Sequence, residues 1–317
     1  MSNLLSFIVK RIFAMIVVVY LIATIVFFMA HASPYNPIKL VLGQHAANPA
    51  AVAAYEHLFG LDQPLWNQYK NYMGGLLHGN LGYSEGIDSF GTPVWDILKG
   101  GVPVSMKLGS FALILSLIIG LPIGLLSALK QNSAIDHGSQ FFVILAYAIP
   151  VFVLIPICQL IFGVYLHWLP ISGWGDPGLA GIKEQILPVT LFAMGLAGFF
   201  AKSFRSFLLE VLSQDYMRTA RAKGLKDRVV IYLHACKNTL LPLASIVGPT
   251  IAFLIVGAFI IENFFGIPGI GLTTIDAVTS SNYPVIEATT ILLAAFVVFI
   301  NMLTDIFYAM VDPRVRM

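Results

Sequence analysis

The sequence predicts an all-α polytopic membrane protein with six transmembrane helices. Of its 317 residues, 58% are hydrophobic and only 11% are charged, whereas soluble domains carry about 25% charged residues. The mean hydropathy is +0.84. Six apolar segments reach the length of about 20 residues that a helix needs to cross about 30 Å of hydrocarbon. The net charge of +2 is too small to indicate a nucleic-acid-binding surface, so nucleic acid is not an expected partner.

The first predicted span covers residues 9–30, within an N-terminal segment 1–30. Lys10 and Arg11 precede the apolar run, and Ala30-His31-Ala32 has the form of a cleavage site, so a signal peptide is the alternative. The run of about 19 residues exceeds the 7 to 15 residues of a signal-peptide core, which favours a retained helix.

Residues 31–103 form a long predicted external segment that contains GLDQPLWNQY and GNLGYS. The spacing of Gly, Pro and Asn predicts turns around short amphipathic helices, such as one over residues 50–59. A cap that packs on the helix tops is favoured over a catalytic domain.

The remaining block, residues 104–312, is predicted to hold five helices, with a cytosolic loop at 206–241 and a cytosolic tail at 313–317. Prolines inside these spans predict kinks that neighbouring helices can accommodate. Gly120 and Gly124, in GLPIG, predict a close helix approach. The five predicted spans are 104–129, 141–166, 186–204, 243–261 and 285–310.

Orientation follows from the basic residues. One side carries thirteen Lys and Arg, whereas the short loops of the other side carry only Lys183. Because cytosolic loops retain Lys and Arg, both termini and the loop 206–241 are predicted to be cytosolic.

Several kinds of chemistry are missing from the sequence. Charged residues are nearly absent from the span interiors, where proton and ion relays would need them, and Asn301 is the notable deep amide. There is no G-x-x-x-x-G-K-[ST] phosphate loop and no H-E-x-x-H zinc pair, and Cys158 and Cys236 form no C-x-x-C pair. We therefore expect no catalytic residue, no metal and no cofactor on this chain.

The stretch DYMRTARAKGLKDR, residues 215–228, lies in a loop with a net charge of +3. A solvated loop attracted to anionic lipid would account for the charge. At helical spacing, however, Met217, Ala220 and Gly224 share one face, with Leu225 beside it, while Arg218 and Arg221 occupy another face. A face of small residues predicts a helix that sits in a groove on another protein.

The longer stretch SFLLEVLSQDYMRTARAKGLKDRVVIYLHACKNTLLP resembles the cytosolic coupling motif of ATP-binding-cassette (ABC) importer permeases of the dipeptide, oligopeptide and nickel branch. The general motif has Glu-Ala-Ala followed, after three residues, by Gly. Ala220 takes the second alanine place and Gly224 the glycine place, while Arg218 and Thr219 replace Glu-Ala.

Other stretches along nearly the whole chain carry the same resemblance. They are FGLDQPLWNQY, GNLGYS, IIENFFGIPGIG and SNYPVI, with Asn80 and Asn282 where Asp is usual. ASPYNPI, after the first span, departs from the usual Pro-Gly-Asp-Pro, which leaves the role of that turn open.

The resemblance implies a type I importer permease fold, in a B-type subunit of the bacterial cytoplasmic (inner) membrane. It implies a homologous C-type permease, two ABC ATPase subunits that bind ATP and Mg, and an extracytoplasmic peptide-binding protein as partners, beside membrane lipid. This chain would be the pore-forming subunit and not an enzyme. The residues that would couple to the ATPases are Asp215, Met217, Arg218, Ala220, Arg221, Lys223, Gly224, Leu225 and Lys226.

The segment FFGIPGIG, residues 264–271, is too rich in Gly and Pro to continue a helix. It is either an external re-entrant element of the translocation path or a tight turn between two spans. The candidate path or gate residues are Phe265, Gly266, Pro268, Gly269, Gly271 and Asn301.

Two questions stay open at this point. An ion-coupled carrier or a channel without an ATPase is the alternative from another class, and a non-transport scaffold is a more distant one. Within the resembled family, peptide is favoured over nickel as substrate, because the spans contain no His, Cys or carboxylate cluster that could coordinate the metal.

Overall fold

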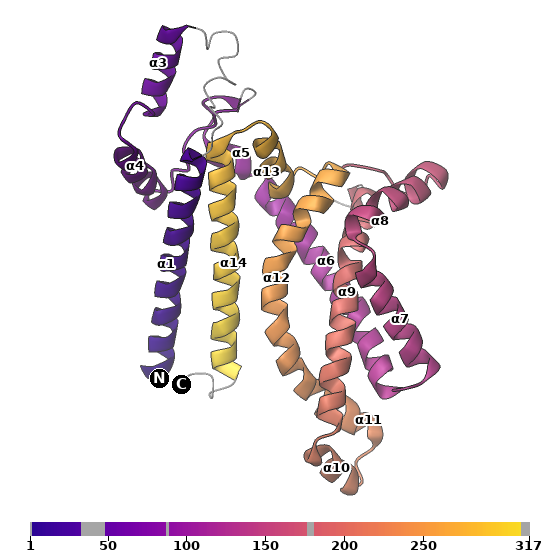
Figure 1. Cartoon of the computed structure of the whole chain (residues 1–317). Coiled ribbons are helices and arrows are strands. Elements are labelled where there is room, and N and C mark those ends of the chain that lie inside the picture. The colour runs from indigo at the N-terminus through magenta and orange to yellow at the C-terminus, as the bar shows by residue number, and fades with distance from the viewer. Residues whose placement is uncertain (1, 33–47, 87–88, 176–180, 312–317) are drawn as a thin grey trace. The chain divides into compact units, whose positions relative to one another are not determined.

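The computed structural model describes residues 2–32, 48–86, 89–175 and 181–311. Regular structure within these residues is helical, and the described β-interaction is a single bridge between Tyr83 and Pro93. The chain forms two compact units (Figure 1): unit 1 is Met1–Val104 with Pro268–Met317, and unit 2 is Ser105–Ile267. The predicted division after residues 30 and 103 separates segments by the side of the membrane, whereas these units are defined by packing. The predicted division therefore stays a prediction.

Unit 1 is built around two long helices, α1 and α14, which pack side by side in opposite directions (Figure 1). Arg11 near the start of α1 pairs with Asp305 near the end of α14 at 2.9 Å. The start of α1 and the end of α14 therefore lie at the same end of the unit. The helices of unit 1 are α1 (Ser2–His31), α3 (Pro49–Phe59), α4 (Leu65–Leu77), α5 (Val94–Leu98), α13 (Ile270–Thr279) and α14 (Tyr283–Val311).

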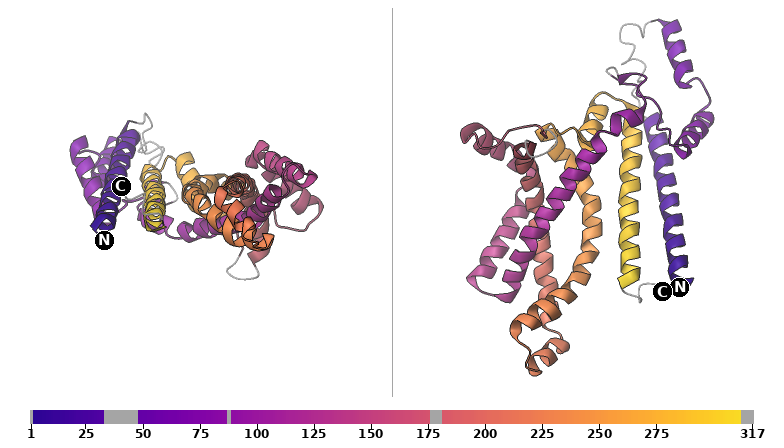
Figure 2. Two further views of the ribbon diagram at one scale, coloured as in Figure 1. Left: turned by 90° about the horizontal axis from the view of Figure 1, so that it is seen from below. Right: turned by 180° about the vertical axis from the view of Figure 1, so that it is seen from behind.

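Unit 2 contains most of α6 and the elements that follow it as far as α12. Figure 2 shows α6 and α7 as a hairpin beside α9. The elements are α6 (Gly101–Leu129), α7 (Ala134–Ala148), α8 (Val151–Cys158), the π-helix η3 (Gln159–Tyr165), α9 (Ile182–Leu212), α10 (Asp215–Ala222), α11 (Asp227–Val229), the π-helix η5 (Val230–Cys236) and α12 (Lys237–Phe265).

Five helices among the described residues are long and apolar enough to cross a membrane, or up to seven if each of two bent pairs counts as one span. The predicted third span, 141–166, differs most from the structure. It begins earlier, at Ala134, and bends by 92° between α7 and α8. Pro150 causes the break, because a proline disfavours the helical conformation of the residue before it, and Ile149 is extended at φ −95° and ψ 113°.

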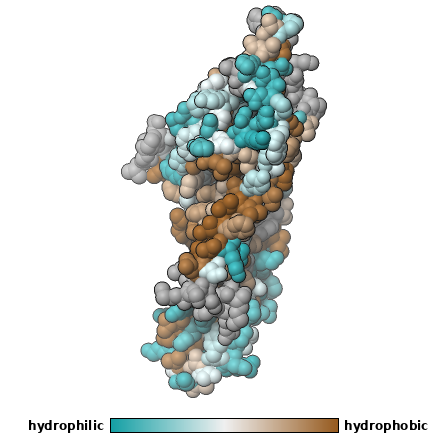
Figure 3. All heavy atoms as spheres, turned by 90° about the vertical axis from the view of Figure 1, so that its left-hand side faces the viewer, coloured by the Kyte–Doolittle hydropathy of each residue, from teal (hydrophilic) through white to brown (hydrophobic). Residues whose placement is uncertain are grey.

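The surface of α1 is apolar over most of its length. Figure 3 shows an apolar band below the hydrophilic surface of the segment that holds α3 and α4. Such a band is expected where lipid replaces water as the solvent. The large exposed side chains of α1 include Leu5, Val9, Phe13, Ile16, Leu21, Ile25 and Met29.

The helix predicted over residues 50–59 is confirmed as α3. Asn48 caps it by accepting a hydrogen bond from the backbone N–H of Ala50 at 3.0 Å, and Gly60 ends it at φ 69°. The next helix, α4, packs on α1: the ring of Tyr69 lies 5.4 Å from the ring of Phe27, and its hydroxyl donates to Tyr20 at 3.0 Å. The ASPYNPI turn lies outside the described residues.

The stretches GNLGYS and SNYPVI meet in unit 1. Asn282 accepts a hydrogen bond from the backbone N–H of Glu85 at 3.2 Å and donates to the hydroxyl of Ser84 at 2.8 Å. Asn282 and Glu85 are both buried. The amide of Asn282 both accepts and donates here, which a carboxylate cannot do. This gives a physical use to the Asn that stands where the resembled branch has Asp.

Glu85 predicts a pH dependence of stability. Burial raises the pKa of its carboxyl to about 7 from an ordinary 4.5, so the folded protein holds a proton that the unfolded chain has already released between those values. Its contribution to the free energy of unfolding is therefore full below pH 4.5, falls as the pH rises to about 7 and is constant above that. The loss is on the order of 3 kcal/mol, since one pKa unit corresponds to about 1.4 kcal/mol.

The measurement is thermal unfolding of the detergent-solubilised protein between pH 5 and 8. Glu85→Gln, which mimics the protonated acid at every pH, is expected to flatten this slope. An unchanged slope in that variant would place the titrating group elsewhere.

The close helix approach predicted at Gly120 and Gly124 is present between α6 and α9. A Cβ at Gly124 would lie 2.5 Å from the carbonyl oxygen of Ala201, and one at Gly120 would lie 2.6 Å from that of Ala197. Glycine is required here because the obstacle is backbone, which cannot turn aside as a side chain can.

Gly124→Ala is therefore expected to lower the free energy of unfolding by about 1–3 kcal/mol, the usual range for overpacking. Gly109→Ala is the matched control on the same helix. A Cβ at Gly109 meets no atom within 4 Å, and alanine is the better helix former, so this variant is expected to keep or raise stability. Equal stability of the two variants in a thermal unfolding assay would contradict the close packing.

Candidate functional site: α10 and the turn after it

The site is a short helix, α10, that lies in the chain between the long helices α9 and α12 of unit 2. The chain leaves α9 at Leu212, forms α10 over Asp215–Ala222, turns at Gly224, and returns through α11 and η5 into α12. Figure 1 shows α10 and α11 beyond the end of α9. The chain therefore connects α10 to α9 through a short turn and to α12 through α11 and η5.

An apolar contact anchors α10 to the rest of unit 2. Met217 is fully buried and Ala220 is 8% exposed. Both lie in one hydrophobic cluster with α6, α9, η5 and α12. The other buried members are Ala128, Phe200, Phe204, Leu208, Val230, Ala235 and Leu243.

This burial corrects one part of the sequence interpretation. The face with Met217 and Ala220 was predicted to receive a partner, but it packs into the chain's own core. The prediction that Met217 and Ala220 share one helical face is confirmed, whereas the prediction that this face points toward a partner is wrong. Sequence spacing identifies which residues share a face and not what lies against that face.

The opposite side of α10 and the following turn are exposed and charged. Asp215, Arg218 and Arg221 are exposed on the helix, and Lys223, Leu225 and Lys226 are exposed after it. The ion pairs within this surface are loose: Arg218 lies 3.7 Å from Asp215, and Arg221 lies 3.8 Å from Asp227. Exposed pairs of this kind contribute about 0–1 kcal/mol each, so the charges stay available to a partner.

Gly224 ends α10 through its backbone angle. Its φ is 78°, in the left-handed region, and its N–H donates to the carbonyl of Arg221 at 2.9 Å. A Cβ at this position would meet no atom of the chain within 4 Å. Within the chain, glycine is therefore favoured at this position by its backbone angle and not by a close approach of other atoms.

The return path from the turn is a π-helix. In η5, from Val230 to Cys236, the buried Val230 and Ala235 face the same cluster as Met217. Asn238, at the start of α12, donates to the hydroxyl of Tyr216 at 3.3 Å, which adds a polar contact between α10 and α12. Sequence reasoning did not single out Tyr216, and nothing in its spacing would have done so.

Two of the predicted path residues, Phe265 and Gly266, lie at the end of α12 in unit 2. The helix ends at Phe265, and Gly266 follows at φ 62°, as expected for a Gly- and Pro-rich segment. Phe265 is 1% exposed, and its carbonyl accepts a hydrogen bond from the N–H of Gly173 at 2.7 Å. These contacts hold the end of α12 in unit 2.

The other path residues belong to unit 1. Pro268 and Gly269 precede α13, Gly271 lies in its first turn, and Asn301 is half-buried on α14. A Cβ at Gly101 would lie 2.9 Å from the carbonyl carbon of Gly269, so backbone packs closely at this turn. A re-entrant gate and a tight turn are both compatible with four residues between two helices, and the role stays a prediction.

No group of three or more His, Cys, Asp or Glu that could hold a metal occurs among the described residues. Within the same ranges, Cys158 and Cys236 are free thiols. That the chain binds no metal or cofactor stays an expectation.

One polar network of unit 2 escaped the sequence analysis. Asp136, at the start of α7, forms an ion pair at 2.7 Å with Arg205 on α9. The available signal was the pattern Ser133-x-x-Asp136 at the start of an apolar run, which resembles a helix capping box. Arg205 had been counted only as one of the thirteen basic residues that set the predicted orientation.

Comparisons with known proteins agree with this architecture. Residues 120–317 match the family described as "Binding-protein-dependent transport system inner membrane component", and residues 4–107 match its N-terminal companion, "Binding-prot-dependent transport system membrane comp, N-term". A crystal structure of an amino acid ABC transporter with histidines is similar in fold, with a TM-score of 0.52 at 15% identity, over 67% of this chain and 92% of that one.

Curated relatives match over the full length. The dipeptide transport system permease protein DppB of Lactococcus lactis is 36% identical over 99% of this chain and 100% of the relative. The oligopeptide transport system permease protein OppB of Salmonella typhimurium is 35% identical over 99% and 100%. DppB of Escherichia coli K12 is 31% identical over 99% of each chain. The chain therefore belongs to the family of binding-protein-dependent transport system inner membrane components.

Proposed function

We propose that this chain is the B-type permease subunit of an ATP-driven peptide importer in the bacterial cytoplasmic membrane. It would form the translocation path together with a homologous C-type permease. Two ABC ATPase subunits would bind ATP and Mg, and an extracytoplasmic binding protein would deliver the peptide. The full-length similarity to dipeptide and oligopeptide permeases supports the substrate class.

The observation that carries the coupling proposal is the two-sided character of α10. Its buried side, Met217 and Ala220, is fixed in the core between α9 and α12, while its other side presents Arg218 and Arg221. An ATPase that binds the charged side could displace α10, and the packing of the buried side would pass this displacement to α9 and α12. This is how a local movement can shift a helix bundle between inward-open and outward-open states.

The charges of this surface suit an acidic groove. With Lys223 and Lys226 exposed in the turn, four cations lie within nine residues of the chain. Long-range attraction between such a cluster and acidic side chains would speed encounter and fix orientation more than it would raise affinity.

Purification of the complex tests the proposal. Co-elution of two ATPase subunits and a second permease, with ATP-dependent peptide uptake in proteoliposomes, is the expected result. A homo-oligomer that transports with an ion gradient would instead favour the secondary carrier. ATP-dependent uptake of nickel in place of peptide would keep the importer and change its substrate.

A further inference from the structure

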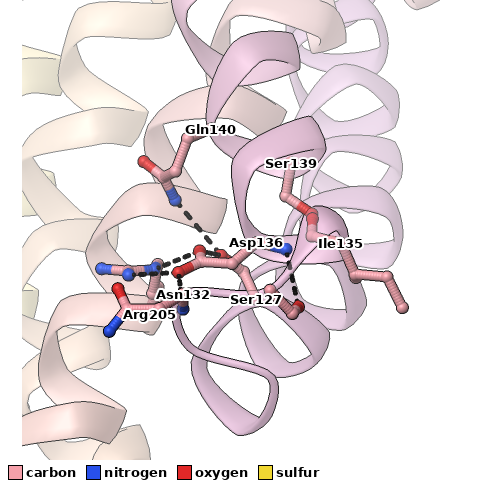
Figure 4. Close-up of polar contacts among 8 residues, drawn as sticks. Ser127, Asn132, Ile135, Asp136, Ser139, Gln140 and Arg205 are labelled. Carbon is pink, nitrogen blue, oxygen red and sulfur yellow. Dashed lines mark hydrogen bonds and ion pairs between the residues drawn. The ribbon is translucent and has the colours of Figure 1, made fainter.

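The turn between α6 and α7 is organised by a buried carboxylate. Asp136, in the first turn of α7, is 2% exposed. The hydroxyl of Ser127 on α6 and the backbone N–H of Asn132 in the turn both donate to it, the latter at 2.9 Å. Gln140, one turn further along α7, donates to the hydroxyl of Ser127 at 3.2 Å. Figure 4 shows these side chains converging on one point.

Arg205 reaches the same carboxylate from α9 (Figure 4). Its Nε donates to Oδ1 at 2.9 Å and its Nη2 donates to Oδ2 at 2.7 Å. Two parallel bonds of this kind fix both distance and angle, which a lysine ammonium cannot do. The side chain of Asp136 is 3% exposed and that of Arg205 is 23% exposed. A buried ion pair is weak evidence for added stability, because desolvation offsets much of the attraction, so its geometry is the more informative property.

The same elements are joined a second time by close packing. Gly124 of α6 lies against the backbone of Ala201, and Gly198 of α9 lies against Val143 and Ala146 of α7. The hairpin of α6 and α7 therefore contacts α9 between Ala197 and Arg205, and the Asp136–Arg205 pair is the one of these contacts that lies closest in the chain to α10.

The pair lies close to the anchored side of α10. Phe204, the neighbour of Arg205, and Leu208, one turn further, belong to the hydrophobic cluster that holds Met217 and Ala220. The helix α9 continues only to Leu212 before the chain enters α10. Arg205 lies about two helical turns before the end of α9, so a displacement of α10 would reach it along that helix. At Arg205, the bidentate contact with Asp136 would pass the displacement to α7 and, through Ser127, to α6.

We propose that Asp136 and Arg205 are positioning residues for energy coupling. The pair makes the α6–α7 hairpin move as one body with α9 and α10, so that ATP-driven displacement of α10 also moves the hairpin. The hydrogen bonds of both side chains are to other residues of the chain, which is why we assign them a positioning role. This inference rests on the proposed function, in which α10 receives the ATPases.

The test uses the complete complex in proteoliposomes and measures complex recovery, ATP hydrolysis and peptide transported per ATP hydrolysed. Asp136→Asn keeps the size of the side chain and the acceptor for Ser127, but removes the charge that binds Arg205 on both oxygens. We expect recovery and hydrolysis close to wild type and a fall in transport per ATP of at least about fivefold, the lower end of usual coupling between sites. Arg205→Lys keeps the charge, loses the fork and is expected to give a smaller fall.

Arg11→Lys is the matched control, because it loosens an Arg–Asp pair of similar length, 2.9 Å, between α1 and α14. Its transport per ATP is expected to stay at the wild-type value. Wild-type coupling in assembled Asp136→Asn complexes would overturn the inference. Failure of both Asp136→Asn and Arg205→Lys to assemble would also overturn it, since the pair would then serve folding alone. A wild-type chain that recovers no ATPase would instead overturn the proposed function.

Discussion

Met217→Asp is expected to detach α10 from unit 2 while the membrane helices stay in place. The Met217 side chain is fully buried among apolar residues of α9, η5 and α12. A carboxylate there has no cation beside it in the cluster, and an uncompensated buried charge costs about 3–5 kcal/mol. Moving α10 into water removes that cost, because only this eight-residue helix and its flanking turns need to shift.

Two measurements check this result. Trypsin added to inside-out vesicles is expected to cut the variant after Arg218 or Arg221 much faster than the wild type, because an unanchored helix of eight residues does not persist in water. Recovery of the ATPases with the purified permease is expected to be lost. The amount of permease in the membrane is expected to be close to normal, since the spans do not depend on α10 for insertion.

Met217→Leu is the control, because a swap of similar volume in an apolar core usually costs less than about 1.5 kcal/mol. It is expected to keep tryptic resistance and ATPase recovery. Equal tryptic rates for Met217→Asp and wild type would mean that α10 is not held by this contact, and the mechanical account of coupling would lose its basis.

The helical class, and the presence of a short charged helix between two spans, could both be predicted from the sequence, because they depend on composition and on the order of segments in the chain. Apolar runs of span length leave few alternatives in a membrane. The spacing of Met217 and Ala220 also gave the correct common face. Spacing cannot show what packs against a face. The face with Met217 and Ala220 had been predicted to contact another protein, but it packs into the apolar core of unit 2.

The bend at Pro150 and the Asp136–Arg205 pair show two further limits. A proline inside an apolar run is compatible with a mild kink or with a sharp break, and the neighbouring packing decides between them. Asp136 and Arg205 are 69 residues apart in the chain, so their contact depends on how α7 and α9 pack. The Ser84–Asn282 contact, across 198 residues, was equally out of reach, although both segments had been singled out by their resemblance to one family.

Gly224→Trp is expected to abolish transport and to loosen ATPase docking, with normal amounts of permease in the membrane. Two effects act at this position. A residue with a Cβ is strained at φ 78°, by about 1–2 kcal/mol. The indole would also project from the exposed turn between Arg221 and Lys226, where the proposed partner approaches, and a Cβ there meets nothing in the chain itself.

A series of substitutions separates the two effects. Gly224→Asn tolerates the left-handed angle best and adds little volume, so it is expected to keep most of the transport and the ATPase recovery. Gly224→Ala adds the strain with almost no bulk and is expected to fall between Asn and Trp. If recovery of the ATPases declines in the order Gly, Asn, Ala, Trp, both angle and bulk matter; if only Trp fails, the partner's approach to the turn is the deciding factor. Normal uptake and normal complex recovery in Gly224→Trp would show that α10 and its turn are not the ATPase contact, because an indole at this position would sterically block a docked partner.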